Sequence, residues 1–84
     1  MNQMKVEQVS EDKKKFHYML LSRLQCDCNY FLGNGNRHVN HLWADTVEEH
    51  IAKMKELWLS FAENDKPEWL SWQDILHYEK EMLN

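Results

Sequence analysis

The sequence predicts an all-α fold, a compact three-helix bundle with a loop rich in glycine and asparagine between the first two helices. Three observations support this prediction. Apolar residues recur at three-to-four spacing over long stretches, as in helices that bury one face. Residues that cap helix N-termini precede these stretches. Both glycines, Gly33 and Gly35, and the only proline, Pro67, lie between the stretches, where helices are expected to end.

The first helix is expected from Glu11 to Leu32. Residues 1–9 are polar with isolated apolar residues, and we expect a flexible lead there, ahead of a single helical domain over residues 10–84. Ser10 can cap the helix, because two acidic residues follow it where the helix dipole favours negative charge. Gly33 is expected to end the helix in a left-handed turn. The predicted buried face consists of Phe16, Met19, Leu20, Leu21, Leu24, Cys28, Phe31 and Leu32.

The second helix is expected from Thr46 to Ala62. Thr46 and Glu49 have the spacing of a capping box, and Asp45 and Glu48 have the same spacing in the adjacent frame. The predicted apolar stripe consists of Val47, Ile51, Met54, Leu57, Trp58 and Phe61. Because proline cannot continue a helix and disfavours helical geometry in the residue before it, Pro67 closes the segment that follows.

The third helix is expected to begin at Trp72 and to continue to near the C-terminus. Ser71 and Asp74 form a third capping box, and Leu70 and Ile75 have the spacing of a hydrophobic staple. Three helices in so short a chain predict a small bundle whose core is limited in size. A core this small makes a helix-mediated homodimer plausible.

Charge is divided unevenly along the chain. Residues 1–42 carry a net charge of +2, and residues 43–84 carry −6. An acidic half repels nucleic acid and suits a partner protein with a basic surface, although charges of this kind also simply solvate helices. No apolar run approaches the roughly 20 residues of a membrane span, so we expect a soluble, cytoplasmic protein. The candidate acidic face consists of Asp45, Glu48, Glu49, Glu56, Glu63, Asp65 and Glu68.

The loop between the first two helices is the second candidate site. Its amides could form a concave nest for an anion, with Arg37 adding a bidentate guanidinium, and an aromatic residue such as Trp43 could stack on a base. The structural alternative is that the glycines shape the turn and Arg37 ties the loop to a helix. The candidate residues are Asn34, Asn36, Arg37, His38, His41 and Trp43.

Metal binding and catalysis have little support in the sequence. Cys26 and Cys28 with His38 and His41 could be written as a zinc motif, but residues two apart on a helix point to opposite sides. No histidine has a serine or cysteine at a spacing that indicates a nucleophile pair. We therefore expect no metal, no cofactor and no enzymatic activity. DNA binding through residues 13–15 is disfavoured, because consecutive lysines spread around a helix and the net charge is −4.

Several segments together resemble a known family, the eleventh subfamily of large polyvalent protein-associated domains. The matching segments are Tyr30 to Arg37 (YFLGNGNR), Leu42 to Ala44 (LWA), His50 to Leu57 (HIAKMKEL), Lys66 to Leu70 (KPEWL), and Ile75 with Tyr78-Glu79. The resemblance covers roughly residues 20–82 and implies a protein or module of bacterial phages, plasmids and other mobile elements. It brings no catalytic residues. At Asp45 the chain departs from the family pattern, in which a glycine often follows Trp43-Ala44.

Three functions remain open from the sequence. The first is a non-enzymatic phage or mobile-element protein that binds a host protein with a basic surface, for example a counter-defence inhibitor such as an anti-CRISPR protein. The second is a protein that binds or sequesters a nucleotide through the glycine loop. The third is a structural accessory module with no ligand. The acidic half and the many aromatic residues favour the first.

Overall fold

The computed structural model describes the backbone of residues 2–84 and the side chains of residues 12–84. Three α-helices follow one another, α1 (Asn2–Leu32), α2 (Val47–Ser60) and α3 (Trp72–Leu83), with no strand in the described part of the chain. Three short 3-10 helices lie in the connections, η1 (Val39–His41), η2 (Trp43–Asp45) and η3 (Glu63–Asp65). The predicted all-α fold with three helices is confirmed.

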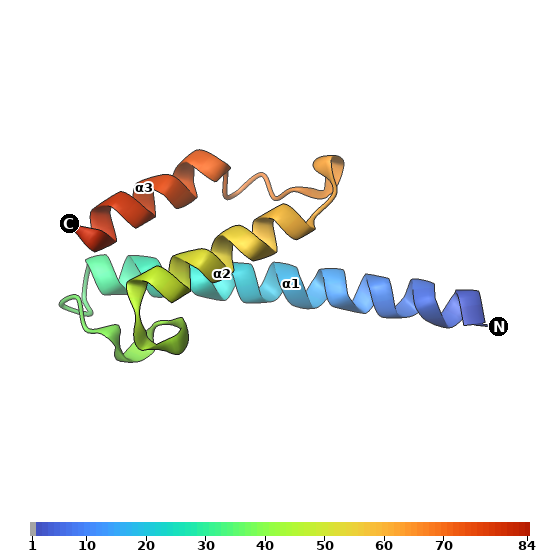
Figure 1. Ribbon diagram of the computed structural model, residues 1–84, viewed down its shortest axis with the longest axis horizontal. Helices are drawn as coiled ribbons and strands as arrows, with labels where there is room; N and C mark the ends of the chain where they lie inside the picture. The colour runs from blue at the N-terminus through green and yellow to red at the C-terminus, as the bar shows by residue number, and fades with distance from the viewer. Residues whose placement is uncertain (1) are drawn as a thin grey trace.

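α2 is the central helix of the bundle. In Figure 1, α1 runs along the length of the molecule, α2 crosses it, and α3 returns beside the C-terminal part of α1. α2 contacts both of the other helices, and α1 also contacts α3 and η1. None of the helices among the described residues combines the length and the apolar character needed to span a lipid bilayer.

The first helix is longer than predicted. α1 begins at Asn2 and not at Glu11, so Ser10 is an interior helical residue and not an N-cap. The physical reason is that residues 2–32 contain neither glycine nor proline, and lysine, glutamate, glutamine and methionine are good helix formers. The predicted flexibility of residues 1–9 stays a prediction, since their side chains lie outside the described residues.

Only part of the predicted apolar face of α1 is buried. Leu21, Leu24, Cys28 and Phe31 belong to the core. Phe16 and Met19 were predicted to be buried, and both are exposed, because α2 and α3 cover α1 on one side only.

The caps of α2 and α3 are largely as predicted. Thr46 caps α2 by accepting a hydrogen bond from the Glu49 amide at 3.1 Å. Ser71 and Asp74 form a complete capping box at the start of α3, with both reciprocal hydrogen bonds present. The alternative frame with Asp45 as a cap is wrong, because Asp45 belongs to η2 and has a φ of 60°.

The predicted left-handed glycine at the end of α1 is also wrong. Neither glycine has a positive φ; Asn36 and Arg37 take the left-handed conformation instead, with φ values of 53° and 62°. The amide of Gly33 continues the helical pattern by donating to the carbonyl of Asn29 at 3.0 Å. α1 therefore ends at Leu32, as predicted, but the left-handed residues of its turn are Asn36 and Arg37 and not Gly33.

One continuous core joins the three helices. The predicted stripe of α2 is buried apart from Trp58, which is half-buried and donates its indole N–H to the carbonyl of Leu70 at 2.9 Å. Trp58 also packs against Trp72, with ring centroids 5.4 Å apart. The core residues are Leu21, Leu24, Cys28, Phe31, Leu42, Val47, Ile51, Met54, Leu57, Phe61, Leu70, Ile75 and Met82.

Candidate functional site

Arg37 is engaged by the fold itself. Its guanidinium donates to the carbonyl oxygens of Glu81 and Met82, at 3.1 and 2.9 Å, and it lies 5.2 Å from the centroid of the Phe31 ring. These carbonyls belong to the last turn of α3, where helical acceptors have no partner within the helix and where positive charge is favoured. Arg37 therefore ties the loop to α3, which is the structural alternative that the sequence left open.

The loop amides are engaged as well. The N–H groups of Gly33, Gly35 and Arg37 donate to carbonyls of the last turns of α1, and the N–H of His38 donates to the carbonyl of Gly35. An anion-binding nest needs successive amides that point at the ligand. Four of the loop amides are therefore not available to form such a nest. The exposed side chains of the loop belong to Asn34, Asn36, His38 and His41, and to Arg37, whose guanidinium is bonded to α3.

His50 is the buried polar residue around which the connection from α1 to α2 is built. Its side chain is 0% exposed. The Trp43 amide donates to His50 Nδ1 at 2.8 Å, so the ring proton is on Nε2, which donates to the carbonyl of Leu24 at 2.9 Å. One neutral imidazole thereby joins α1, η2 and α2. Burial lowers the pKa of His50, and this effect exceeds the opposing effects of the Leu24 hydrogen bond and the Asp27 charge.

A strained turn follows directly after the Trp43 amide. Ala44 and Asp45 have φ values of 55° and 60°, a conformation that is costly for residues other than glycine. The turn is held by the His50 hydrogen bond, by the buried Leu42 side chain and by the Thr46 cap. It directs Trp43 outward, with 42% of its surface exposed.

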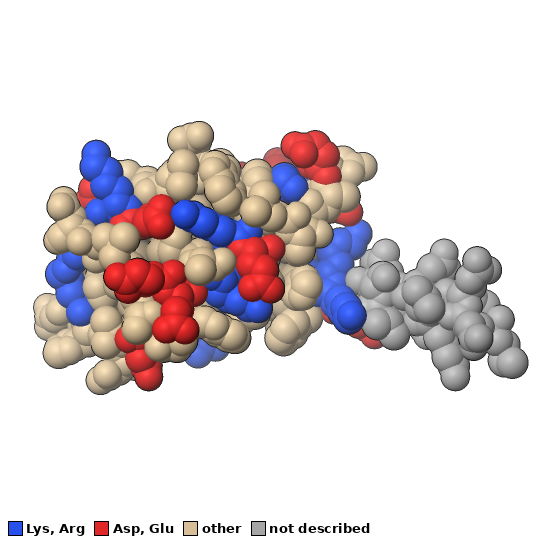
Figure 2. All heavy atoms as spheres, in the orientation of Figure 1, with Lys and Arg blue, Asp and Glu red and all other residues tan. Residues whose placement is uncertain are grey.

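The predicted acidic face is divided into two groups. α2 has 14 residues and is therefore about 21 Å long. Asp45, Glu48 and Glu49 lie at its N-terminal end, and Glu63, Asp65 and Glu68 lie beyond its C-terminal end. Glu56 lies between them and pairs with Lys53 at 3.5 Å. Figure 2 shows the acidic side chains interspersed with lysine and arginine side chains and not as one continuous surface.

Trp43, Asp45, Glu48 and Glu49 form a compact surface that we call the acidic end. All four residues are exposed. Glu49 interacts with the Thr46 hydroxyl at 3.1 Å, while Asp45 and Glu48 form no side-chain hydrogen bond or ion pair with the described residues. Lys53 Nζ lies 5.4 Å from the centroid of the Trp43 ring, so this ring already attracts a cation within the chain.

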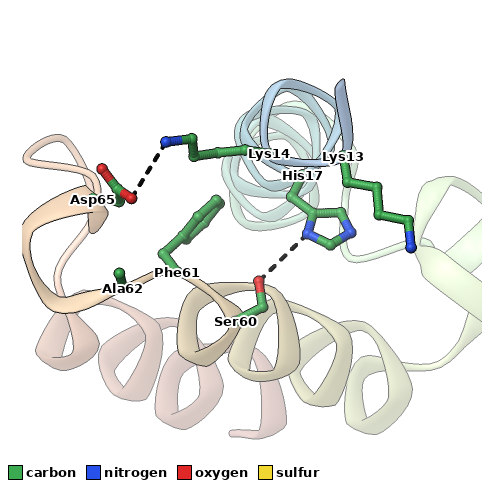
Figure 3. Close-up of a pocket in the computed structure, with 7 residues that line it drawn as sticks. All are labelled: Lys13, Lys14, His17, Ser60, Phe61, Ala62 and Asp65. Atoms are coloured by element: carbon green, nitrogen blue, oxygen red, sulfur yellow. Dashed lines mark hydrogen bonds and ion pairs between the residues drawn. The ribbon is translucent and has the colours of Figure 1, made fainter. Parts of the chain in front are cut away.

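Another polar cluster lies where α1 meets the C-terminal end of α2. In Figure 3, His17 and Ser60 point toward one another and Lys14 points toward Asp65, around a pocket of about 360 Å³. Ser60 Oγ lies 3.4 Å from His17 Nδ1, a proximity that the sequence did not reveal. The Ser60 hydroxyl also donates to the carbonyl of Leu57 within α2, at 2.6 Å. The pair stabilises the contact between helices.

The two cysteines have different surroundings. Cys28 Sγ lies 3.5 Å from Met54 Sδ in the core, and burial raises the pKa of its thiol to about 12, with a smaller contribution from Asp27. Cys26 is exposed. Within the described part of the chain, no three His, Cys, Asp or Glu side chains are placed to hold a metal ion together.

Sequence reasoning missed the role of His50. A signal was present, because residue 50 lies three positions after Val47 and four before Met54, within the apolar stripe of α2. A histidine on such a stripe needs hydrogen-bond partners when it is buried. Those partners, the Leu24 carbonyl and the Trp43 amide, are main-chain groups that the side-chain pattern does not reveal.

Comparison with known proteins places the chain in a family. Among the curated proteins and the solved structures, none matches the chain at a significant level. The family described as large polyvalent protein-associated domain 11 matches residues 14–82, which include the core, the loop and the acidic end. The chain therefore belongs to the large polyvalent protein-associated domain 11 family.

Proposed function

We propose that the chain is a non-enzymatic binding protein of a phage or mobile element, which acts in the cytoplasm of a bacterial host by contacting a host protein with a basic surface. The net charge of −4 and the concentration of acidic residues after position 42 support a basic partner, because complementary charge steers association. The same charge disfavours nucleic acid as the partner.

The observation that carries the proposal is the acidic end. A strained turn, fixed by the buried His50, presents a half-exposed tryptophan beside carboxylates that have no cationic partner among residues 12–84. Tryptophan is enriched among the residues that contribute most to protein–protein affinity. A surface that is already rigid loses little conformational entropy on binding, which favours affinity.

A counter-defence inhibitor is the concrete form of this function. The groove of a nuclease that holds nucleic acid is basic, so a small acidic protein can occupy it in place of the phosphate backbone. An anti-CRISPR protein is one example of such an inhibitor. The family resemblance supports a role in mobile elements.

The nucleotide-binding alternative lacks comparable support. The guanidinium of Arg37 and several amides of the loop are engaged in hydrogen bonds within the chain. A nucleotide would have to displace these contacts in order to use them. A purely structural accessory module would need neither an exposed tryptophan nor a strained turn, so the acidic end favours the binding protein.

The test is affinity capture from host lysate, followed by titration of the captured protein at two salt concentrations. The double variant Glu48→Lys/Glu49→Lys reverses two charges at the acidic end. The matched control, Glu63→Lys/Glu68→Lys, reverses two exposed charges beyond the other end of α2. We expect capture by the wild type and the control, loss of capture with the acidic-end variant, and weaker binding at high salt. Equal binding by all three proteins, or binding that salt does not weaken, would contradict the proposal.

A further inference from the structure

A groove lies next to the acidic end, between α1 and the connection that contains η1 and η2. Its volume is about 240 Å³. Leu20 and Leu24 of α1 line one side, and Leu42 and Trp43 line the other. The polar residues of the lining are Arg23, Asp27 and His41. Pockets for small-molecule ligands are usually larger, roughly 300–1,000 Å³. The groove is therefore suited to a single side chain and not to a nucleotide.

Asp27 gives this groove its chemical character. The Asp27 side chain is only 21% exposed, so its carboxylate is partly removed from water. Its ion-pair partner is Arg23, whose Nε lies 4.0 Å from Asp27 Oδ1, too far for a hydrogen bond. The Arg23 side chain is 77% exposed, so water screens its attraction to Asp27. A partly desolvated carboxylate without a close donor favours the approach of another cation.

We propose that the groove binds one arginine side chain of the partner protein. The proposal rests on the proposed function, because it names the residue through which a basic partner would be held. The arginine stem packs between the leucine side chains and Trp43, and the guanidinium donates hydrogen bonds to Asp27. The groove adjoins the acidic end through Trp43, so a neighbouring basic residue of the partner would face Glu48 and Glu49.

Arginine fits this groove better than lysine for two reasons. Its planar guanidinium can donate two parallel hydrogen bonds to one carboxylate, and it stacks on aromatic rings. It is also more weakly hydrated than an ammonium group, which lowers the cost of entering a groove with apolar walls. The Trp43 ring already lies near the ammonium group of Lys53, which indicates that its electrostatics suit a cation.

The experiment uses the full chain and needs no identified partner. Isotopically labelled protein is titrated with N-acetylarginine amide, and the NMR signals of the Trp43 indole and the Asp27 amide are followed. We expect saturable shifts at both groups. The neutral analogue N-acetylcitrulline amide is expected to cause none. Asp27→Asn is expected to weaken binding roughly tenfold or more, because a charge-assisted hydrogen bond is lost.

The control for Asp27→Asn is Asp12→Asn, which removes the same charge from an exposed position on the same helix. It is expected to leave the titration unchanged, and circular dichroism establishes that both variants are folded. Absence of shifts in the groove, equal shifts with the citrulline compound, or full binding by Asp27→Asn would overturn the proposal. Equal binding of N-acetyllysine amide would overturn the preference for arginine.

The outcome is separable from that of the proposed function. If the arginine probe fails while Glu48→Lys/Glu49→Lys abolishes capture, the arginine groove is wrong and the acidic end remains the binding surface. If the probe binds as expected while the charge reversal has no effect on capture, the groove stands and the acidic end does not bind the partner.

Discussion

At the scale of single residues, the loop after α1 is shaped by close approach and not by glycine's access to positive φ. A Cβ atom added at Gly35 would lie 2.7 Å from the carbonyl oxygen of Tyr30 and 2.8 Å from its ring. The Gly35 amide donates to that same carbonyl at 2.6 Å. At Gly33, the nearest atom to an added Cβ is the Asn29 carbonyl oxygen, at 3.1 Å. The two glycines therefore differ in how strictly they are required.

The first prediction compares Gly35→Ala with Gly33→Ala. Gly35→Ala is expected to lower the free energy of unfolding by about 1–3 kcal/mol, because a main-chain oxygen cannot move aside without disturbing the end of α1. Gly33→Ala is expected to lower the free energy of unfolding by clearly less. Its added methyl group needs only a small shift of its neighbour, and alanine has fewer conformations than glycine in the unfolded chain. Urea unfolding measures both. A larger loss for Gly33→Ala than for Gly35→Ala would refute this account of the loop.

At the scale of elements, His50 connects α2 to α1 and to η2 through its two ring nitrogens. The helices themselves are specified locally, α2 and α3 by capping hydrogen bonds and α1 by a long stretch without breakers. Their connection is different, because the Leu24 carbonyl and the Trp43 amide are satisfied by the same imidazole. Protonation of Nδ1 would place a second N–H against the Trp43 amide and remove its acceptor.

The second prediction is a pH dependence of stability that originates at His50. Because its pKa is lowered in the folded protein, the unfolded chain takes up a proton first as the pH falls below the ordinary value of 6.5. The contribution of His50 is thus fully present above pH 6.5 and is lost as the pH falls toward the lower folded pKa. The slope of the free energy of unfolding against pH is limited to about 1.4 kcal/mol per pH unit for one proton.

Urea unfolding over the range from neutral to mildly acidic pH measures this slope. His50→Gln is expected to be less stable at neutral pH and to lose this component of the pH dependence. His77→Gln, at an exposed position of α3, serves as the control and is expected to behave like the wild type. An unchanged slope in His50→Gln would show that the pH dependence comes from other groups.

At the scale of the whole molecule, a small core on one side of α1 coexists with an uncovered outer face. Met54 is fully buried at the centre of α2 and contacts Cys28 of α1. Met19, on the outer face of α1, is 72% exposed. Apolar surface is exposed to water at Phe16, Met19 and Trp69, although the core of the chain is small. A homodimer mediated by a helix stays a prediction.

The third prediction uses these two methionines. Met54→Ala is expected to cost about 2–5 kcal/mol, a large part of the roughly 5–15 kcal/mol that stabilises a small domain. Met19→Ala is expected to change the free energy of unfolding by no more than about 0.5 kcal/mol. Thermal and urea unfolding measure both variants. A substantial loss of stability with Met19→Ala would mean that the outer face of α1 is covered, for example by a second copy of the chain.

Periodicity and capping residues were sufficient to predict three helices, the buried stripe of α2 and the start of α3. They failed where the chain depends on main-chain partners or on which side of a helix is covered. Phe16 and Met19 fit the spacing of a buried face, but spacing alone does not determine the width of the contact. The acidic residues were read as one face, whereas the length of α2 separates them into two groups. His50 and Asp27 were overlooked because their surroundings come from segments distant in sequence.

The hydrogen bond of the Trp43 amide provides a way to detect the separation of α1 from α2. The amide proton is accepted by His50, whose other ring nitrogen donates to the Leu24 carbonyl of α1, so we expect separation of α1 from α2 to expose this hydrogen bond to water. Amides within α2 can remain protected in a helix that has separated from its neighbours. In hydrogen exchange, the Trp43 amide would therefore report the undocking of the two helices, as distinct from the unravelling of either one.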